Sequence, residues 1–354
     1  MARSPGGEAI GPCPKVNRSA GTGAETSRVG EVDMRAWQFV DPTHRLVLNE
    51  VPDPTPGPDE VLIQVKAAGL CHSDVMYITT GYPAMPFTPM TQGHENAGII
   101  TALGEGVSDW QVGNVVGVCS SGERPPLGMF TPGGFADYLV ADAADLVRVP
   151  EGLDLSLAAL ATDAGMTSYH AMIKEGRAGP GMKVGVIGYG GLGQIGARVA
   201  VLAGAEVHVA ETKEDVWPLA IEAGVAACVK DAEEWAVEPG PNPLRSESGF
   251  DLVVDYAGFD TTQKALDAVK RGGTVVQVGL GKPTFTIVAA TILGKRIIGS
   301  LGGTVQDIAE VFDLMLKGEI QPAYTEIGFD EIATGIDRLE AGQVTGRLVA
   351  RFGD

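Results

Sequence analysis

The sequence "VGVIGYGGLGQIG", residues 184–196, decides the fold. Its short apolar run predicts a buried strand, and glycines then recur at Gly188, Gly190 and Gly193 before the helix-like segment "QIGARVAVLAGA". In such an array the first glycine permits a tight turn, the second lets the backbone approach a pyrophosphate, and the third lets the helix pack on the strand. The helix N-terminus offers free N–H groups to the phosphates. The array predicts a dinucleotide-binding βαβ unit; a glycine-rich turn without this function is the alternative.

The next strand-like segment, "EVHVAE", ends in Glu211. This position is close to the offset of about 20 residues at which an acidic side chain meets the adenosine ribose. A carboxylate there accepts a hydrogen bond from the 2′-hydroxyl and repels a 2′-phosphate, so NAD is favoured over NADP. Lys213 weakens this discrimination because its charge lies two residues away. A solvated strand end is the alternative interpretation of Glu211.

Two kinds of periodicity divide the chain. Residues 34–150 contain short apolar runs broken by proline and glycine, which indicate small antiparallel strands and predict a β-barrel. From residue 155 onward, strand-like and helix-like segments alternate, which predicts βαβ units and a parallel sheet. Residues 1–33 hold no aromatic residue and are rich in Gly, Ser, Pro and Ala. We expect them to be a disordered tail, an added remnant or an overextended start site.

Composition excludes several classes of partner. The 26 Lys and Arg against 45 Asp and Glu give a formal net charge of -19, which would repel nucleic acid and anionic membranes, so we expect a small-molecule partner. The uncharged run from Val75 to His94 contains three prolines and predicts loops, not a membrane span. The four cysteines are widely scattered, unlike those of a secreted disulfide scaffold, which favours the cytoplasm.

Four residues are candidates for a metal site: Cys71 in "GLCHSD", His94 and Glu95 in "QGHENAG", and Asp163 in "LATDAGMTSYH". Each is weak alone, because a free cysteine is more often a small buried hydrophobe and an aspartate at a helix start is usually a cap. Their spacing does not decide between a metal site and unrelated side chains.

The segments "GLCHSD", "QGHENAG", "TDAGMTSYHA" and "GYGGLG", in this order, resemble the zinc-dependent alcohol dehydrogenases of the medium-chain dehydrogenase/reductase superfamily. The resemblance runs from about residue 34 to the end of the chain. It implies an α/β protein with a GroES-like β-barrel catalytic domain, residues 34–164 and 303–354, and a Rossmann domain with a doubly wound parallel sheet, residues 165–302. It also implies an active site in the cleft between the two domains.

The same resemblance implies a ligand set. Cys71 and His94 match the first two zinc ligands, and Glu95 matches an acidic neighbour that coordinates zinc only transiently and belongs to the catalytic group. Asp163 replaces the second cysteine of many members, as in bacterial secondary-alcohol dehydrogenases. A fourth position then stays open for water or substrate, as a catalytic zinc requires. Asp74 matches the carboxylate that orients the histidine ligand.

Further roles follow from the resemblance. Ser73 matches the hydroxyl that passes the proton, and His72 matches a catalytic-site residue that faces the cofactor phosphates. The histidine that usually continues this relay is replaced by Met76, so proton exit needs His72, water or another route. The remaining cofactor-binding matches are Thr167 near the nicotinamide, Gly191 in the glycine loop, and Arg347 at the pyrophosphate.

One departure concerns a second metal. Many members carry a lobe with four cysteines that binds a structural zinc, but this chain has Cys119 alone in a shortened segment, so we expect one catalytic zinc per subunit and no structural zinc. Substrate-pocket walls would come from scattered residues, which are equally interpretable as ordinary core. They are Tyr77, Phe87, Trp110 and Met166.

The leading hypothesis is a zinc-dependent oxidoreductase that transfers hydride between a secondary or primary alcohol and NAD. One alternative is a zinc-independent enoyl or quinone reductase of the same superfamily; another is a nucleotide-binding protein without turnover. The resemblance also implies a homodimer or homotetramer.

Overall fold

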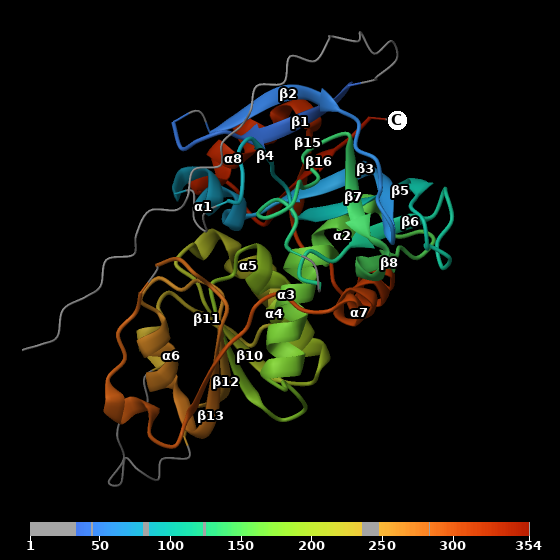
Figure 1. Ribbon diagram of the computed structural model, residues 1–354. Helices are drawn as coiled ribbons and strands as arrows, with labels where there is room; N and C mark the ends of the chain where they lie inside the picture. Colours follow the sequence, from blue (N-terminus) through green and yellow to red (C-terminus); the bar gives the residue numbers. More distant parts are fainter. Residues whose placement is uncertain are drawn as a thin grey trace, which may run out of the picture. The chain divides into compact units, whose positions relative to one another are not determined.

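The glycine-rich stretch lies at the centre of a six-stranded parallel sheet (Figure 1). The computed structural model describes residues 33–43, 45–80, 85–122, 125–235, 248–282 and 284–353. The strand before the glycines, β9, pairs with β10 on one side and with β12 on the other. In spatial order the strands are β11 (Ala227–Val229), β10 (Glu206–Ala210), β9 (Lys183–Ile187), β12 (Phe250–Asp255), β13 (Val269–Gln277) and β14 (Arg296–Gly299).

Both faces of this sheet are covered, because alternate residues of each strand join different cores. Val184 and Val186 of β9 pack into the larger core with α4 (Gly191–Leu202). Val253 and Val275 point the other way and pack with α6 (Thr262–Ala268). A strand that is buried on both faces needs apolar residues at successive positions, not only at alternate ones. The predicted doubly wound parallel sheet is confirmed.

The other sheets are built mainly from antiparallel strands. A seven-stranded sheet unites segments from both ends of the chain, since β16 pairs with β3. Its members are β3 (Glu60–Leu70), β5 (Glu95–Leu103), β6 (Val115–Val118), β7 (Tyr138–Asp142), β8 (Leu146–Arg148), β15 (Tyr324–Gly328) and β16 (Arg347–Arg351). A three-stranded sheet holds β1 (Asp33–Phe39), β2 (Leu46–Pro52) and β4 (Met90–Thr91). The domain boundaries at 164 and 303 stay a prediction.

One helical run, residues 155–175, is not regular. It consists of α2 (Leu155–Leu160), a π turn (Ala161–Gly165), α3 (Met166–Tyr169) and a second π turn (His170–Glu175). Asp163 lies in the first π turn, a kind of structure that is rare and frequent at functional sites. The neighbouring Thr162 hydroxyl donates to Ala159 O and accepts from Asn96 N, which ties this turn to β5.

Several shorter elements complete the described chain. The α-helices are α1 (His72–Thr80), α5 (Trp217–Glu222), α7 (Val305–Leu316) and α8 (Ile332–Glu340). The 3-10 turns are η1 (Ala143–Asp145), η4 (Glu214–Val216), η5 (Ala232–Trp235), η7 (Ala289–Ile292) and η8 (Phe329–Glu331).

Two sequence predictions meet the structure differently. The prediction of loops after Val75 is wrong for the first part of that run, because α1 extends to Thr80. The prolines that motivated it all follow this helix, so they do not oppose it. Residues 1–32 of the predicted tail lie outside the described residues, and Asp33, its last residue, already pairs with Pro52 in β1. None of the described helices is long and apolar enough to cross a membrane.

Candidate metal and nucleotide site

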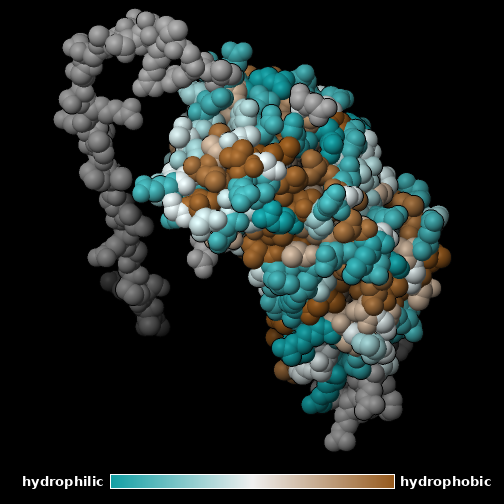
Figure 2. Space-filling view, turned by 90° about the vertical axis from the view of Figure 1, so that its right-hand side faces the viewer, coloured by the Kyte–Doolittle hydropathy of each residue, from teal (hydrophilic) through white to brown (hydrophobic). Residues whose placement is uncertain are grey.

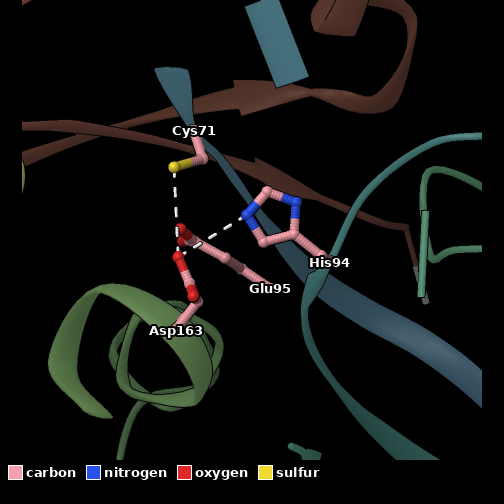
Figure 3. A group of neighbouring side chains, drawn as sticks. All are labelled: Cys71, His94, Glu95 and Asp163. Carbon is pink, nitrogen blue, oxygen red and sulfur yellow. Dashed lines mark hydrogen bonds and ion pairs between the residues drawn. The ribbon is translucent and has the colours of Figure 1, made fainter. Parts of the chain in front are cut away.

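Four potential metal donors converge at the end of β3 (Figure 3). Within the described ranges, Cys71, His94, Glu95 and Asp163 each offer one ligand atom, and these atoms all lie within 4.8 Å of one another. Asp163 Oδ2 lies 3.9 Å from Cys71 Sγ and 3.5 Å from His94 Nε2. The strand pairing explains the first contacts, because the β3–β5 register sets Gly69 opposite Glu95. The π turn then brings Asp163 to the same point.

Asp74 holds two members of this group in place. Its Oδ1 lies 3.0 Å from His94 Nδ1, and its Oδ2 accepts a hydrogen bond of 2.9 Å from the backbone N–H of Cys71. The side chain of Asp74 is fully buried, so this geometry is fixed by packing as well as by charge. With Nδ1 held by a carboxylate, the imidazole presents Nε2 to the cluster, as in most histidine metal ligands.

Negative charge dominates the electrostatics of the cluster. Burial opposes the charged form of His94. The negative charge of Asp74 and the hydrogen bonds of the His94 ring with Asp163, Asp74 and Cys71 nevertheless raise its pKa well above the usual value. Burial also opposes ionisation of Asp163, yet the hydrogen bond from His94 lowers its pKa to about 2. Asp163 is therefore ionised at neutral pH.

Glu95 and Arg347 form a buried ion pair beside the cluster. Arg347 Nη2 contacts Glu95 Oε1, and the two side chains are 4% and 0% exposed. Burial raises the pKa of Glu95 to about 7 in spite of this partner. Its second oxygen, Oε2, is buried and has no hydrogen-bond partner among the described residues. A buried oxygen of this kind is costly unless a donor or cation lies near it.

This donor set fits a zinc ion. Thiolate, imidazole and carboxylate are the ligands that Zn²⁺ prefers, and three protein ligands leave a position free in catalytic sites. The unpartnered Oε2 of Glu95 is an additional acceptor for a cation at this point. The Thr167 hydroxyl donates to Asp163 Oδ1 at 3.2 Å, which leaves Oδ2 to face Cys71 and His94. Sequence reasoning missed this bond, although a spacing of four residues on a helix could have indicated it.

The glycine loop fits a pyrophosphate. Gly188 adopts a φ of +85°, and a Cβ atom on Gly193 would lie 1.8 Å from Gly188 O. In contrast, a Cβ atom on Gly190 would meet nothing within 4 Å, so the turn borders open space. Gly190 is the N-cap of α4 and supplies no side-chain cap for the helix N–H groups. Free donors, open space and a helix N-terminus are the features that bind phosphate.

Glu211 stands at the end of β10 beside this loop. Its Oε2 accepts from Tyr189 N at 2.7 Å, and its Oε1 accepts from Lys213 N at 2.8 Å. The carboxylate therefore already fixes the glycine turn in the protein alone. The ammonium group of Lys213 donates to Gly342 O at 3.0 Å.

Arg347 connects the metal donors to the glycine loop. A Cβ atom on Gly191 would lie 2.1 Å from Arg347 Cδ, so the arginine stem packs against the start of α4 while its guanidinium meets Glu95. Sequence reasoning placed Arg347 at the pyrophosphate and did not predict the pair with Glu95.

The other candidate residues are less closely grouped. Ser73 Oγ lies 3.7 Å from Cys71 Sγ. His72 is exposed on the first turn of α1; partial burial of its ring and the positive charges of Arg347 and Lys213 lower its pKa. Burial raises the pKa of Tyr77. The charges of His94 and Asp163 also shift this pKa, so Tyr77 lies near the metal donors.

The predicted pocket residues other than Tyr77 have different surroundings. Trp110 packs with the barrel core and donates to Ala143 O at 3.0 Å. Phe87 is half exposed. Met166 is buried, with its sulfur 3.6 Å from Cys119 Sγ. Of these three residues, Met166 adjoins a metal donor, because its backbone N–H donates to Asp163 O.

A parallel nucleotide-binding sheet joined to an antiparallel barrel, with cysteine, histidine and carboxylate donors beside a glycine loop, defines a class of metal-dependent dehydrogenases. Residues 57–151 match the alcohol dehydrogenase GroES-like domain family, and residues 191–317 match the zinc-binding dehydrogenase family. An alcohol dehydrogenase of Geobacillus stearothermophilus is 31% identical over 338 residues, which cover 89% of this chain and 97% of the relative.

Solved structures agree. Acetophenone reductase from Geotrichum candidum in complex with NAD has a TM-score of 0.80 and 31% identity, and the match covers 92% of this chain and 98% of that chain. The alcohol dehydrogenase of Aeropyrum pernix has a TM-score of 0.81 and 26% identity, with 90% and 99% of the chains covered. The chain belongs to the zinc-type medium-chain alcohol dehydrogenase family, which confirms the predicted family and fold class.

Proposed function

We propose that this protein is a zinc-dependent oxidoreductase that transfers hydride reversibly between an alcohol, secondary or primary, and NAD, giving the ketone or aldehyde. The observation that carries this proposal is the convergence of Cys71, His94 and Asp163 beside a glycine loop. The relatives support it, since they are named alcohol dehydrogenases and one similar structure contains NAD.

Cys71, His94 and Asp163 would hold the zinc ion, and Glu95 would act as a transient ligand through its unpartnered Oε2. A bound zinc supplies polarisation of the alcohol oxygen, and NAD supplies the hydride acceptor. The alcohol carbon loses hydride and the alcohol oxygen loses a proton. Ser73, 3.7 Å from Cys71 Sγ, is the hydroxyl we assign to take that proton. Met76 cannot carry it further, so exposed His72 or water delivers it to solvent.

The same proposal assigns the cofactor. The backbone of Gly188, Gly190, Gly191 and Gly193 would receive the pyrophosphate, and Glu211 would accept from the adenosine ribose with its remaining lone pairs. Arg347 would face the phosphates, where its positive charge is favourable. His72, whose pKa is lowered, would face them as an uncharged hydrogen-bonding ring. Thr167, which already orients Asp163, would border the nicotinamide.

Two experiments test the function. Protein purified without added zinc is analysed by metal mass spectrometry, and a panel of alcohols and enones is screened by NADH absorbance. We expect about one zinc per chain and turnover of alcohols. A Cys119→Ser variant should keep this zinc, because Cys119 contacts Met166 in the core and has no role in a second site. Metal-free protein that reduces enones would favour the zinc-independent reductase, and NAD binding without turnover would favour a nucleotide-binding protein.

We also propose the domain division 34–164 with 303–354 against 165–302, and a homodimer or homotetramer as the assembled state. The edge of the parallel sheet supports a homo-oligomer, because β14 is its last strand. Large hydrophobic residues around this strand are exposed, and hydrophobic patches also interrupt the polar surface drawn in Figure 2. The exposed large hydrophobic residues in the segment 280–301, which contains β14, are Leu280, Phe285, Val288, Ile292, Leu293, Ile297 and Leu301.

A further inference from the structure

Ser168 is a junction between three elements. It lies on α3, one residue after Thr167, and is completely buried. Its hydroxyl donates to Leu192 O at 2.9 Å, in the first turn of α4. Its own carbonyl accepts from the Tyr256 hydroxyl at 3.1 Å. The helix that carries Asp163 is thus bonded both to the glycine loop and to the segment after β12.

Tyr256 is held by a loop with a fixed shape. Asp255, fully buried at the end of β12, accepts from the N–H groups of Ala257 and Gly258 at 3.0 Å each and from the Thr261 hydroxyl at 2.6 Å. Three hydrogen bonds to one buried carboxylate leave this loop little freedom. These bonds therefore restrain the backbone that carries Tyr256.

The position of Tyr256 explains why residue 196, the last of the stretch 184–196, is a glycine. A Cβ atom on Gly196 would lie 2.2 Å from the Tyr256 hydroxyl, so α4 must carry glycine where the tyrosine crosses it. At the other end of the glycine loop, a Cβ atom on Gly188 would lie 3.3 Å from Ala257 Cβ. The loop after β12 thus packs closely against both ends of residues 188–196.

We propose that Tyr256 and Ser168 are positioning residues that set the glycine loop at a fixed distance from the helix bearing Asp163. This proposal rests on the function proposed above, in which hydride passes between an alcohol held near Asp163 and a nicotinamide held by the glycine loop. Neither residue belongs to the donor cluster; they act through Leu192 on one side and Thr167 on the other. Hydride transfer needs the alcohol and the nicotinamide at a fixed distance, because small misplacements of reacting groups lower the rate by large factors.

The first test is Tyr256→Phe, which keeps the ring over Gly196 and removes only the bond to Ser168 O. We expect kcat for alcohol oxidation to fall by about 10- to 100-fold, with zinc content and NADH affinity unchanged. The primary deuterium isotope effect on kcat should rise, because the hydride step becomes slower than product release. A variant with less folded enzyme would lose amplitude with an unaltered isotope effect.

Two further variants bracket this result. Ser168→Ala removes the bond to Leu192 O and should reproduce the rise in isotope effect even if Tyr256→Phe folds poorly. Tyr324→Phe is the matched control, since Tyr324 also packs on the larger core, on β15, and belongs to no proposed site. Its kcat and isotope effect should equal those of the wild type.

Hydrogen exchange tests the proposal without turnover. In Ser168→Ala, amide exchange should increase both in residues 161–169 and in residues 188–196, because the lost bond from Ser168 Oγ to Leu192 O joins these two segments. An increase confined to residues 254–260, or wild-type exchange and isotope effect in both variants, would overturn the positioning role. Wild-type protein without zinc or alcohol turnover would instead overturn the proposed function, while the exchange result would still decide whether the junction exists.

Discussion

We predict that the donor cluster needs Asp163 to hold a metal. It is the only member of the cluster that comes from the helical run, and it contacts both Cys71 and His94. We expect Asp163→Ala to abolish stoichiometric zinc and to lower alcohol turnover at least about 100-fold, since metal polarisation contributes several kcal/mol. NADH affinity should persist, because the glycine loop does not contain this residue.

Metal mass spectrometry and NADH fluorescence measure these two quantities in one preparation. Asp163→Cys is the matched control, because a thiolate is also a zinc ligand and should retain the metal. Full activity in Asp163→Ala would show that the third ligand is a different residue.

Glu95 and Arg347 form a buried ion pair, in which each charge is compensated by the other. Arg347→Met removes the cation and leaves Glu95 as an uncompensated buried carboxylate. Breaking such a pair costs about 3–5 kcal/mol in the free energy of unfolding, measurable by denaturant titration. The double variant Glu95→Gln with Arg347→Met should recover part of this loss, because no buried charge remains.

Arg351→Met provides the comparison on the same strand. Arg351 is 37% exposed and its ion pairs with Asp154 and Glu326 are 3.9 and 4.0 Å long, so its loss should cost less than about 1 kcal/mol. Equal losses for Arg347→Met and Arg351→Met would mean that the buried pair contributes nothing special to stability.

Among the secondary-structure elements, α7 shows how far local sequence signals reach. Thr304 accepts from Asp307 N, and Asp307 Oδ2 accepts from Thr304 N at 2.9 Å, which makes a capping box. Ile308, Val311, Phe312 and Met315 form its buried face, at the helical spacing visible in the sequence. Thr304→Ala should lower the free energy of unfolding by about 1 kcal/mol.

Denaturant titration checks this value against Gln306→Ala. Gln306 is equally exposed on the first turn but is not a cap, so its loss should stay within about 0.5 kcal/mol. A Thr304→Ala variant as stable as Gln306→Ala would show that packing alone fixes the start of α7.

The helical run with Asp163 shows where local signals end. Its apolar and polar residues are compatible with a regular helix, and nothing in the sequence marks the π turns at Ala161–Gly165 and His170–Glu175. Partners distant in the chain contact this run: Asn96 N donates to Thr162 in the first π turn, and the Tyr256 hydroxyl donates to Ser168 O on α3, between the two turns. Pairing of this kind cannot be obtained from periodicity.

The convergence of the four metal donors could likewise not be predicted from their spacing in the sequence. The β3–β5 register that brings Cys71 toward His94 and Glu95 is shifted at two irregularities, between Leu62 and Ile63 and between Val65 and Ala67. A single shift reverses which side chains face the core, so register has to be known from the structure. The family motifs were enough to predict the candidate metal ligands. The ion pair between Arg347 and Glu95 and the hydrogen bond from Thr167 to Asp163 could be found only in the structure.

For the whole molecule, the edge of the parallel sheet predicts self-association through β14. A terminal strand exposes unpaired backbone groups, and Ile297 on this strand is 40% exposed, with Leu293 and Leu301 near it at 65% and 91%. Monomeric proteins seldom leave a long apolar edge free. A two-fold axis beside β14 would pair the strand with its own copy, antiparallel, and bury these side chains on both subunits.

Ile297→Lys places a charge on this strand and should convert the assembly to smaller species, with half the wild-type mass if β14 joins a dimer, by light scattering after gel filtration. Ile221→Lys is the control, because Ile221 is 51% exposed on α5 and should leave the mass unchanged. A monomeric wild type would refute the homo-oligomer itself. An oligomer of unchanged mass in Ile297→Lys would instead place the subunit contact elsewhere on the surface, away from β14.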